Sequence, residues 1–77
     1  MNKKRRKAIK EIIDQLEMPK EQIVSVSEEE QEAFDNLPEN IQYSERGEAM
    51  SEAVFDLDNT ASYIDSIIDS LQDIIER

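Results

Sequence analysis

Cysteine, histidine and tryptophan are absent from this 77-residue sequence, which contains only one glycine and two prolines. Without cysteine no disulfide framework can form, and without cysteine or histidine the usual zinc sites are excluded. Nucleophilic catalysis that relies on histidine or cysteine is excluded for the same reason. We therefore predict a protein that is not an enzyme and that needs no metal or other cofactor.

Long apolar runs are also missing. The longest covers only residues 53–55, whereas a helix that spans a membrane needs about 20 apolar residues. The basic stretch Lys3–Lys7 could begin a secretion signal, but Glu11 and Asp14 interrupt the apolar segment that should follow. We expect no membrane span, and the lack of cysteine favours a cytoplasmic location.

The chain is small, and its apolar content is concentrated in aliphatic residues. A chain of this length buries only about 60% of the surface that it exposes when unfolded. Below about 80 residues a lone core rarely supplies more than 3–5 kcal/mol. Ten isoleucines and four leucines nevertheless argue against disorder. We expect the protein to associate with itself and so to bury more apolar surface.

Charge is divided unevenly along the chain, which carries 19 acidic and 9 basic residues and a net charge of −10. The first ten residues contain six cations and no acid, whereas residues 11–77 have a net charge of −16. Such a division is unlike a uniformly basic nucleic-acid-binding protein. It indicates a basic arm attached to an acidic body. The basic arm comprises Lys3, Lys4, Arg5, Arg6, Lys7 and Lys10.

Apolar residues at helical spacing predict a basic amphipathic helix within residues 1–18. Pro19 should end this helix, because a proline disfavours helical geometry in the residue before it. We expect residues 19–43 to form a linker and a short helix. The short helix would begin at Ser27, which forms a capping-box pattern with Glu30.

The long segment 44–77 dominates the sequence and predicts an acidic amphipathic helix capped by Ser44. Its apolar residues occupy neighbouring rows, which argue against a simple two-stranded coiled coil and for packing among two or more helices. We therefore predict an all-α fold in which this helix packs with the short middle helix and the basic N-terminal helix, as an oligomeric helical bundle. The residues predicted to mediate self-association are Met50, Ala53, Val54, Leu57, Ala61, Ile64, Ile67, Ile68, Leu71, Ile74 and Ile75.

The charges of the first and last helices oppose the helix dipoles, which favour anions near N-termini and cations near C-termini. Cations begin the first helix, and acidic residues end the last one. Mutual neutralisation would explain both arrangements. We expect the basic start of one to lie beside the acidic end of the other, antiparallel, within a chain or between chains.

Residues 53–61 resemble the DxDxT signature of haloacid-dehalogenase-type phosphatases, with Asp56 as nucleophile and Asp58 as acid/base. In that family the motif follows a buried strand of a much larger sheet, and magnesium and a downstream lysine complete the site. No lysine follows Lys20 in this chain, and the helical apolar spacing continues through the motif. We therefore interpret these residues as part of a helix.

Two exposed features of the long helix are candidate contacts for a partner. Phe55 and Tyr63 lie eight residues apart and on a similar side of the helix, where they contact a partner or cover a neighbouring helix. The candidate partner-facing acidic residues are Asp58, Asp65, Asp69, Asp73 and Glu76. Such carboxylates could imitate the phosphates of DNA, or they could form a solvated outer face.

Residues 28–77, about two-thirds of the chain, resemble a type of small acidic helical protein of Gram-positive bacteria and their phages. The run that carries the resemblance is Leu37–Met50, LPENIQYSERGEAM. The resemblance implies a phage or prophage origin, and it transfers no site residues.

The leading functional prediction is a non-enzymatic interaction protein that self-associates. One alternative is an inhibitor that mimics nucleic acid and binds a basic host protein, such as a nuclease or a DNA-binding defence protein. Another is binding of nucleotides or anionic surfaces by the basic arm. Direct binding of nucleic acid is not expected, because the net charge of residues 11–77 would repel it.

Overall fold

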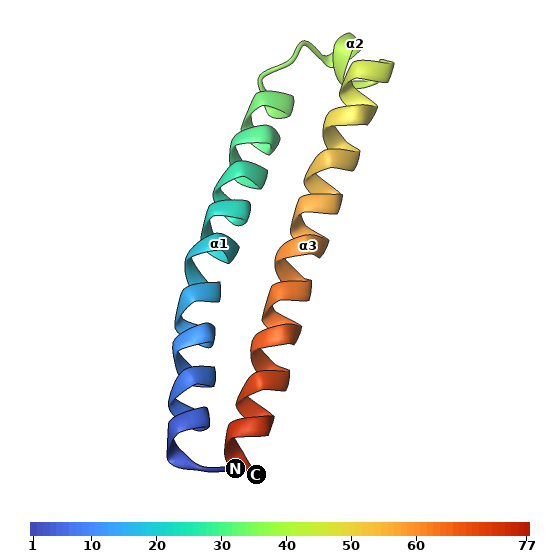
Figure 1. Cartoon of the computed structure of the whole chain (residues 1–77). Coiled ribbons are helices and arrows are strands. Elements are labelled where there is room, and N and C mark those ends of the chain that lie inside the picture. Colours follow the sequence, from blue (N-terminus) through green and yellow to red (C-terminus); the bar gives the residue numbers. More distant parts are fainter.

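Three helices form the computed structural model, which describes all 77 residues. Helix α1 runs Lys3–Asp35, α2 runs Glu39–Gln42, and α3 runs Glu45–Glu76, with no strand. Figure 1 shows α1 and α3 side by side and antiparallel, with α2 in the connection at one end and both termini at the other. The prediction of an all-α fold is confirmed, as is the antiparallel placement of the basic start beside the acidic end, here within one chain.

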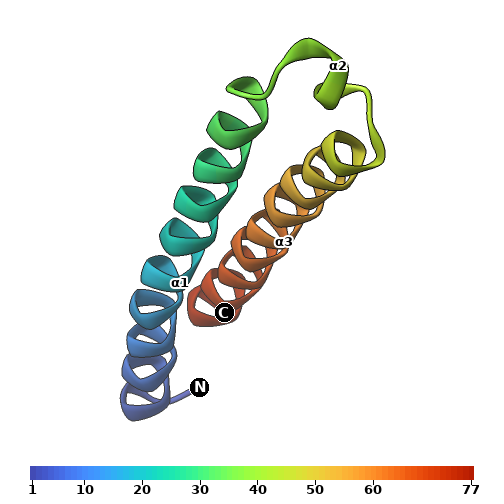
Figure 2. The ribbon, with the colours of Figure 1, turned by 90° about the horizontal axis from the view of Figure 1, so that it is seen from above.

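The molecule is a rod rather than a globule. Its Cα atoms extend 59 × 15 × 12 Å with a radius of gyration of 17.6 Å, compared with about 11 Å for a globular domain of this length. The view from above shows that two long helices and the short α2 make up the whole width (Figure 2). Only five of the 77 residues are buried. The fold is therefore a helical hairpin with a narrow core.

The contact between α1 and α3 follows a repeating pattern that we call the seam. On both helices the seam residues are separated alternately by three and four positions, the spacing that keeps one stripe of a helix against its partner. In α1 they are Arg6, Ile9, Ile13, Leu16, Lys20, Ile23, Ser27, Glu30 and Phe34, all buried or partly buried. In α3 they are Gly47, Met50, Val54, Leu57, Ala61, Ile64, Ile68, Leu71 and Ile75.

Pro19 does not end the first helix, so the predicted boundary at residue 18 and the linker that follows it are wrong. Pro19 lies inside α1 and is exposed. A proline within a helix costs about 3 kcal/mol, because it removes one backbone hydrogen bond and its ring crowds the preceding turn. Leu16 and Ile23 pack against α3 on either side of Pro19, and this burial keeps the helix continuous.

The prediction of a short helix that begins at Ser27 is also wrong. Ser27 lies in the interior of α1, where it is 3% exposed. The separate short helix is instead α2, which begins after Pro38. The boundary near Pro38 agrees with the sequence, because α1 ends at Asp35 and the chain turns there.

Helix α3 begins as the sequence predicts. The Ser44 hydroxyl accepts a hydrogen bond from the Gly47 amide at 3.4 Å and caps the helix. Residues 53–61, which resemble a phosphatase signature, lie within α3 and not after a strand. Their interpretation as helix is confirmed.

The turn around α2 packs closely on the start of α3. The Gln42 side-chain amide donates hydrogen bonds to the carbonyl oxygens of Phe34, at 3.1 Å, and Leu37, at 3.2 Å. Gly47 is buried beneath this turn. A methyl carbon on Gly47 would lie 2.7 Å from the Ile41 carbonyl oxygen and closer still to that of Gln42. Residue 47 must therefore be glycine, because the backbone of Ile41 and Gln42 occupies the space that a side chain would need.

Replacement of Gly47 by alanine should lower the free energy of unfolding by about 1–3 kcal/mol, because the added methyl group meets backbone that cannot easily move. Helix propensity alone predicts the opposite, a gain of about 1 kcal/mol. Urea unfolding followed by circular dichroism measures the change. Ser51→Ala, at an exposed position of the same helix, is the control and should be neutral or slightly stabilising. A more stable Gly47→Ala variant would contradict the close contact.

Replacement of Pro19 by alanine should raise the free energy of unfolding by up to about 3 kcal/mol, because it restores a backbone donor within α1. The helix content from far-ultraviolet circular dichroism should stay the same, since α1 is already continuous. A clear gain in helix content would instead mean that Pro19 interrupts α1 in solution.

Candidate functional site

Two rows of residues border the seam on each helix and give the hairpin two different sides. Because the helices are antiparallel, equivalent rows of α1 and α3 meet on the same side. The apolar flank consists of Ile12, Pro19, Val26 and Ala33 of α1 with Ala53, Thr60, Ile67 and Ile74 of α3. The polar flank consists of Lys10, Glu17, Val24 and Gln31 of α1 with Ser51, Asp58, Asp65 and Gln72 of α3.

Two polar contacts join the helices at the polar flank. The Ser27 hydroxyl donates a hydrogen bond to the Asp58 carboxylate at 2.6 Å. The Lys20 ammonium group donates one to the Asp65 carboxylate at 2.9 Å and lies 3.6 Å from Glu17. Seven residues separate the two contacts on each helix. A shift of either helix along the other would break both contacts, so they specify the register of the hairpin.

Lys20 occupies a seam position at which most other residues are apolar. Its ammonium group bonds to Asp65. The hydrogen bond that Lys20 donates to Asp65 raises the pKa of Lys20 above the ordinary 10.5; desolvation lowers this pKa, and the negative charges of Asp65 and Glu17 raise it further. Since the pKa is raised on folding, the stabilisation is fully present below pH 10.5 and is lost as the pH rises through the raised pKa.

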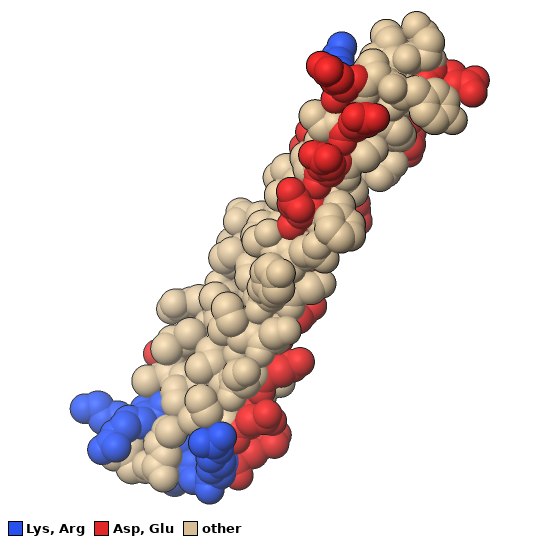
Figure 3. All heavy atoms as spheres, turned by 90° about the vertical axis from the view of Figure 1, so that its right-hand side faces the viewer, with Lys and Arg blue, Asp and Glu red and all other residues tan.

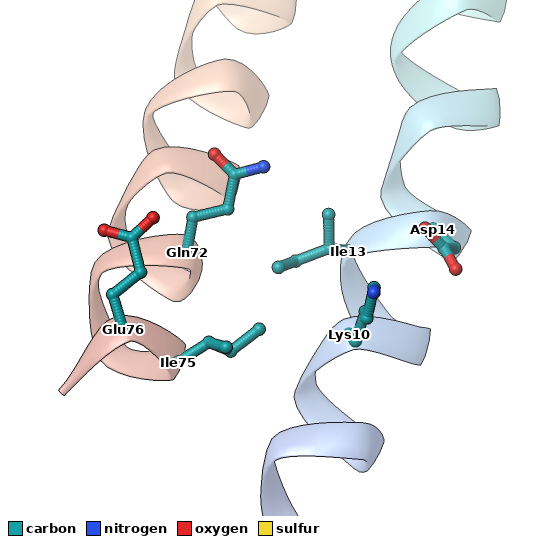
Figure 4. A pocket seen from close by; sticks show the side chains of 6 residues that line it. All are labelled: Lys10, Ile13, Asp14, Gln72, Ile75 and Glu76. Carbon is teal, nitrogen blue, oxygen red and sulfur yellow. The ribbon is translucent and has the colours of Figure 1, made fainter.

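An open hollow lies on the polar flank near the chain termini. It has a volume of about 370 Å³ and is lined by Lys10, Ile13, Asp14, Gln72, Ile75 and Glu76. Figure 4 shows Ile13 and Ile75 between the two helices and Glu76 on the outer side of α3. Both walls are helix surface, and the lining combines charges of either sign with two isoleucines. It has no set of groups that converge on one ligand.

The apolar flank leaves large side chains in contact with solvent. Ile12 is 45% exposed, and Val26 and Ile67 are each 50% exposed. Between Ile12 and Ala33 in α1, and between Ala53 and Ile74 in α3, this row contains no charged residue. Figure 3 shows a broad uncharged band through the middle of the rod, with acidic residues gathered toward one end and along one edge and basic residues at the other end.

Eight of the eleven residues predicted to mediate self-association lie in the seam, where they pack against α1 of the same chain. They are Met50, Val54, Leu57, Ala61, Ile64, Ile68, Leu71 and Ile75. The remaining three, Ala53, Ile67 and Ile74, belong to the apolar flank. This apolar row of α3 is therefore covered only in part, since Ala53 and Ile74 are partly buried and Ile67 is exposed.

The candidate acidic residues divide into two groups. Asp58 and Asp65 bond to α1 instead of lying opposite the apolar face as predicted, because Ser27 and Lys20 stand in the α1 seam. Asp69, Asp73 and Glu76 are exposed and form no ion pair. The five candidate carboxylates therefore differ in their surroundings, and their role as mimics of DNA phosphates stays a prediction.

The basic arm forms the first two turns of α1 and lies beside the end of α3 (Figure 1). Lys3, Lys4, Arg5, Lys7 and Lys10 are exposed, and no residue of the arm forms an ion pair within the chain. The Nε atom of Arg6 is buried without a hydrogen-bond partner. The arm therefore lies near the acidic end of α3 as expected, but without direct pairing.

The two aromatic residues of α3 do not cover α1. Phe55 is 67% exposed and Tyr63 is 68% exposed. Phe55 stands next to the polar flank, whereas Tyr63 lies four residues before Ile67 and extends the apolar flank outward. The two side chains therefore border different flanks of α3, and their contact with a partner stays a prediction.

No group of acidic side chains is arranged to hold a metal ion. None of the helices combines the length and the apolar character that crossing a membrane would need. Comparison with known proteins found no matching family model, curated protein or solved structure.

Lys20 and Ser27 are interface residues that the sequence reasoning missed. The signal was present, because the alternation of three and four positions that links Ile9, Ile13 and Leu16 continues to Ile23 and Phe34. Lys20, Ser27 and Glu30 occupy the intervening positions. Because these polar residues and Pro19 interrupt the apolar spacing, the sequence did not reveal that the spacing belongs to one continuous helix.

Ser27→Ala should lower the free energy of unfolding by about 1–2 kcal/mol, because Asp58 loses a donor in a partly buried contact. A double-mutant cycle with Asp58→Ala should give a coupling energy of about 1 kcal/mol by urea unfolding. Ser25→Ala, at an exposed position of α1, is the matched control and should show no coupling to Asp58→Ala. Absence of coupling in the Ser27 cycle would show that the bond does not set the register.

Proposed function

We propose that the protein is a non-enzymatic helical interaction protein that self-associates, and that its apolar flank is the contact between copies. The observation that carries this proposal is the exposure of Ile12, Val26 and Ile67 along one uncharged side of the hairpin. The seam residues are not available for contact between copies, because α1 and α3 already pack on each other along the seam.

The exposed surface of the chain supports association. A globular monomer of 8.9 kDa exposes about 4,800 Å², whereas the hairpin exposes 5957 Å². The excess of about 1,200 Å² exceeds the roughly 800 Å² that one partner contributes to an interface of standard size. The hairpin thus exposes more surface than a stable monomer of its mass normally does.

The core of the hairpin supports the same conclusion. Ile13, Ala61 and Ile68 are the only buried hydrophobic residues, and no side chain is fully buried. Stable domains usually enclose a core between two packed layers, and this hairpin is a single layer of two long helices (Figure 2). A second layer on the apolar flank would cover Ile12, Val26 and Ile67 and complete the enclosure.

Replacement of Ile67 by lysine should dissociate the oligomer, because a charge at the centre of the contact would lose its hydration. Light scattering after size exclusion should give a mass of at least twice 8.9 kDa for the natural chain and the monomer mass for the variant. Phe55→Lys is the matched control, since it adds the same charge at a more exposed apolar position of the same helix. It should leave the mass unchanged. A natural chain that stays monomeric at high micromolar concentration would refute the proposal.

A further inference from the structure

The two ends of the hairpin carry opposite charge. The end with the termini, residues 1–10 and 68–77, contains seven cations and three acids. The end around α2, residues 28–52, contains nine acids and Arg46 as its single cation. Figure 3 shows most of the basic residues at one extremity of the rod, with acidic residues beside them along one edge and further acidic residues toward the other end. Folding thus produces a molecule with a strong charge asymmetry along its length of 59 Å.

We propose that the partner on the apolar flank is a second copy of this chain in antiparallel orientation, so that the basic end of each copy lies beside the acidic α2 end of the other. The inference rests on the proposed self-association and specifies its geometry. The product is a four-helix bundle made from two hairpins related by a twofold axis across the rod.

Two hairpins that associate through one side can lie parallel or antiparallel, and the charges of their ends decide between these two orientations. A parallel pair would place seven cations beside seven cations and nine acids beside nine acids. An antiparallel pair places unlike ends together. Charges within about 10 Å still interact at moderate salt concentration, and the effect is repeated at both ends of a twofold dimer.

The charged residues that border the apolar flank are likewise basic at the end with the termini and acidic toward the α2 end. Arg5 is seven residues before Ile12, and therefore lies in the same row at the basic end. Glu29 and Asp56 follow Val26 and Ala53 by three residues, and so border the flank toward the α2 end. In the antiparallel dimer, Arg5 of one copy approaches Glu29 of the other.

The antiparallel dimer also explains why the basic arm has no ion-pair partner within its own chain. Its cations form no ion pair within the chain, although the acidic end of α3 lies close by. A second copy supplies the acidic residues of its α2 end to the same region. The side of the rod, 59 Å long and 15 Å wide between Cα atoms, is large enough to bury the roughly 800 Å² per partner that stable interfaces need.

Distances between spin labels on two copies test the orientation. The absence of cysteine allows labels at Gln72→Cys and Ser51→Cys, which are exposed positions of the polar flank separated by about 32 Å along α3. In the antiparallel dimer, a mixture of the two singly labelled proteins should give an intermolecular distance roughly 15 Å shorter than Ser51→Cys alone. The parallel dimer reverses this order.

The outcomes separate the inference from the proposed function. A shorter distance between like labels shows a parallel dimer and overturns the inference, while self-association stands. A monomer mass with no intermolecular distance overturns both, and assigns the apolar flank to a different partner.

A charge exchange provides a second test that does not depend on labels. Arg5→Glu should weaken the dimer about three- to tenfold, because an attractive pair becomes repulsive at two symmetric places. Adding Glu29→Lys should restore the natural dissociation constant. In a parallel dimer Arg5 of one copy lies beside Arg5 of the other. Arg5→Glu would then not weaken association, and Glu29→Lys would not act as a rescue. Either of those results would overturn the antiparallel arrangement.

Discussion

Packing along the seam between α1 and α3 is the interaction on which the rest of the structure depends. It keeps α1 helical through Pro19, because the residues on both sides of the proline bury apolar surface against α3. It also holds Gly47 beneath the α2 turn and brings the two termini together. The Ser27–Asp58 and Lys20–Asp65 contacts add little burial, but they select one register for two helices that could otherwise slide.

A seam between only two helices leaves both sides of the hairpin open, and the two sides differ in chemistry. The polar flank carries the interhelical bonds and the open hollow. The apolar flank carries isoleucine and valine side chains that remain about half exposed. The rod therefore has two chemically different sides and two ends of opposite charge.

The sequence predicted the parts of the fold that depend on local chemistry. Ser44 caps α3 as its side chain and position suggest, Pro38 lies where the chain turns, and α3 runs to Glu76. The same reasoning failed at Pro19, where an intrinsic helix breaker is overruled by tertiary packing. It also took Ser27 for a cap, since the residues that follow it satisfy the local pattern equally well as a helix start or a helix interior.

The sequence by itself determined that the chain is helical, that its long C-terminal helix has one broad apolar face, and that its charges are segregated. These properties follow from periodicity and composition, which need no knowledge of contacts between distant residues. Only the tertiary structure decided which apolar row α1 covers and which row remains exposed. That choice depends on the orientation and register of two helices, and these are set by pairs such as Ser27 and Asp58 that lie 31 residues apart in the chain.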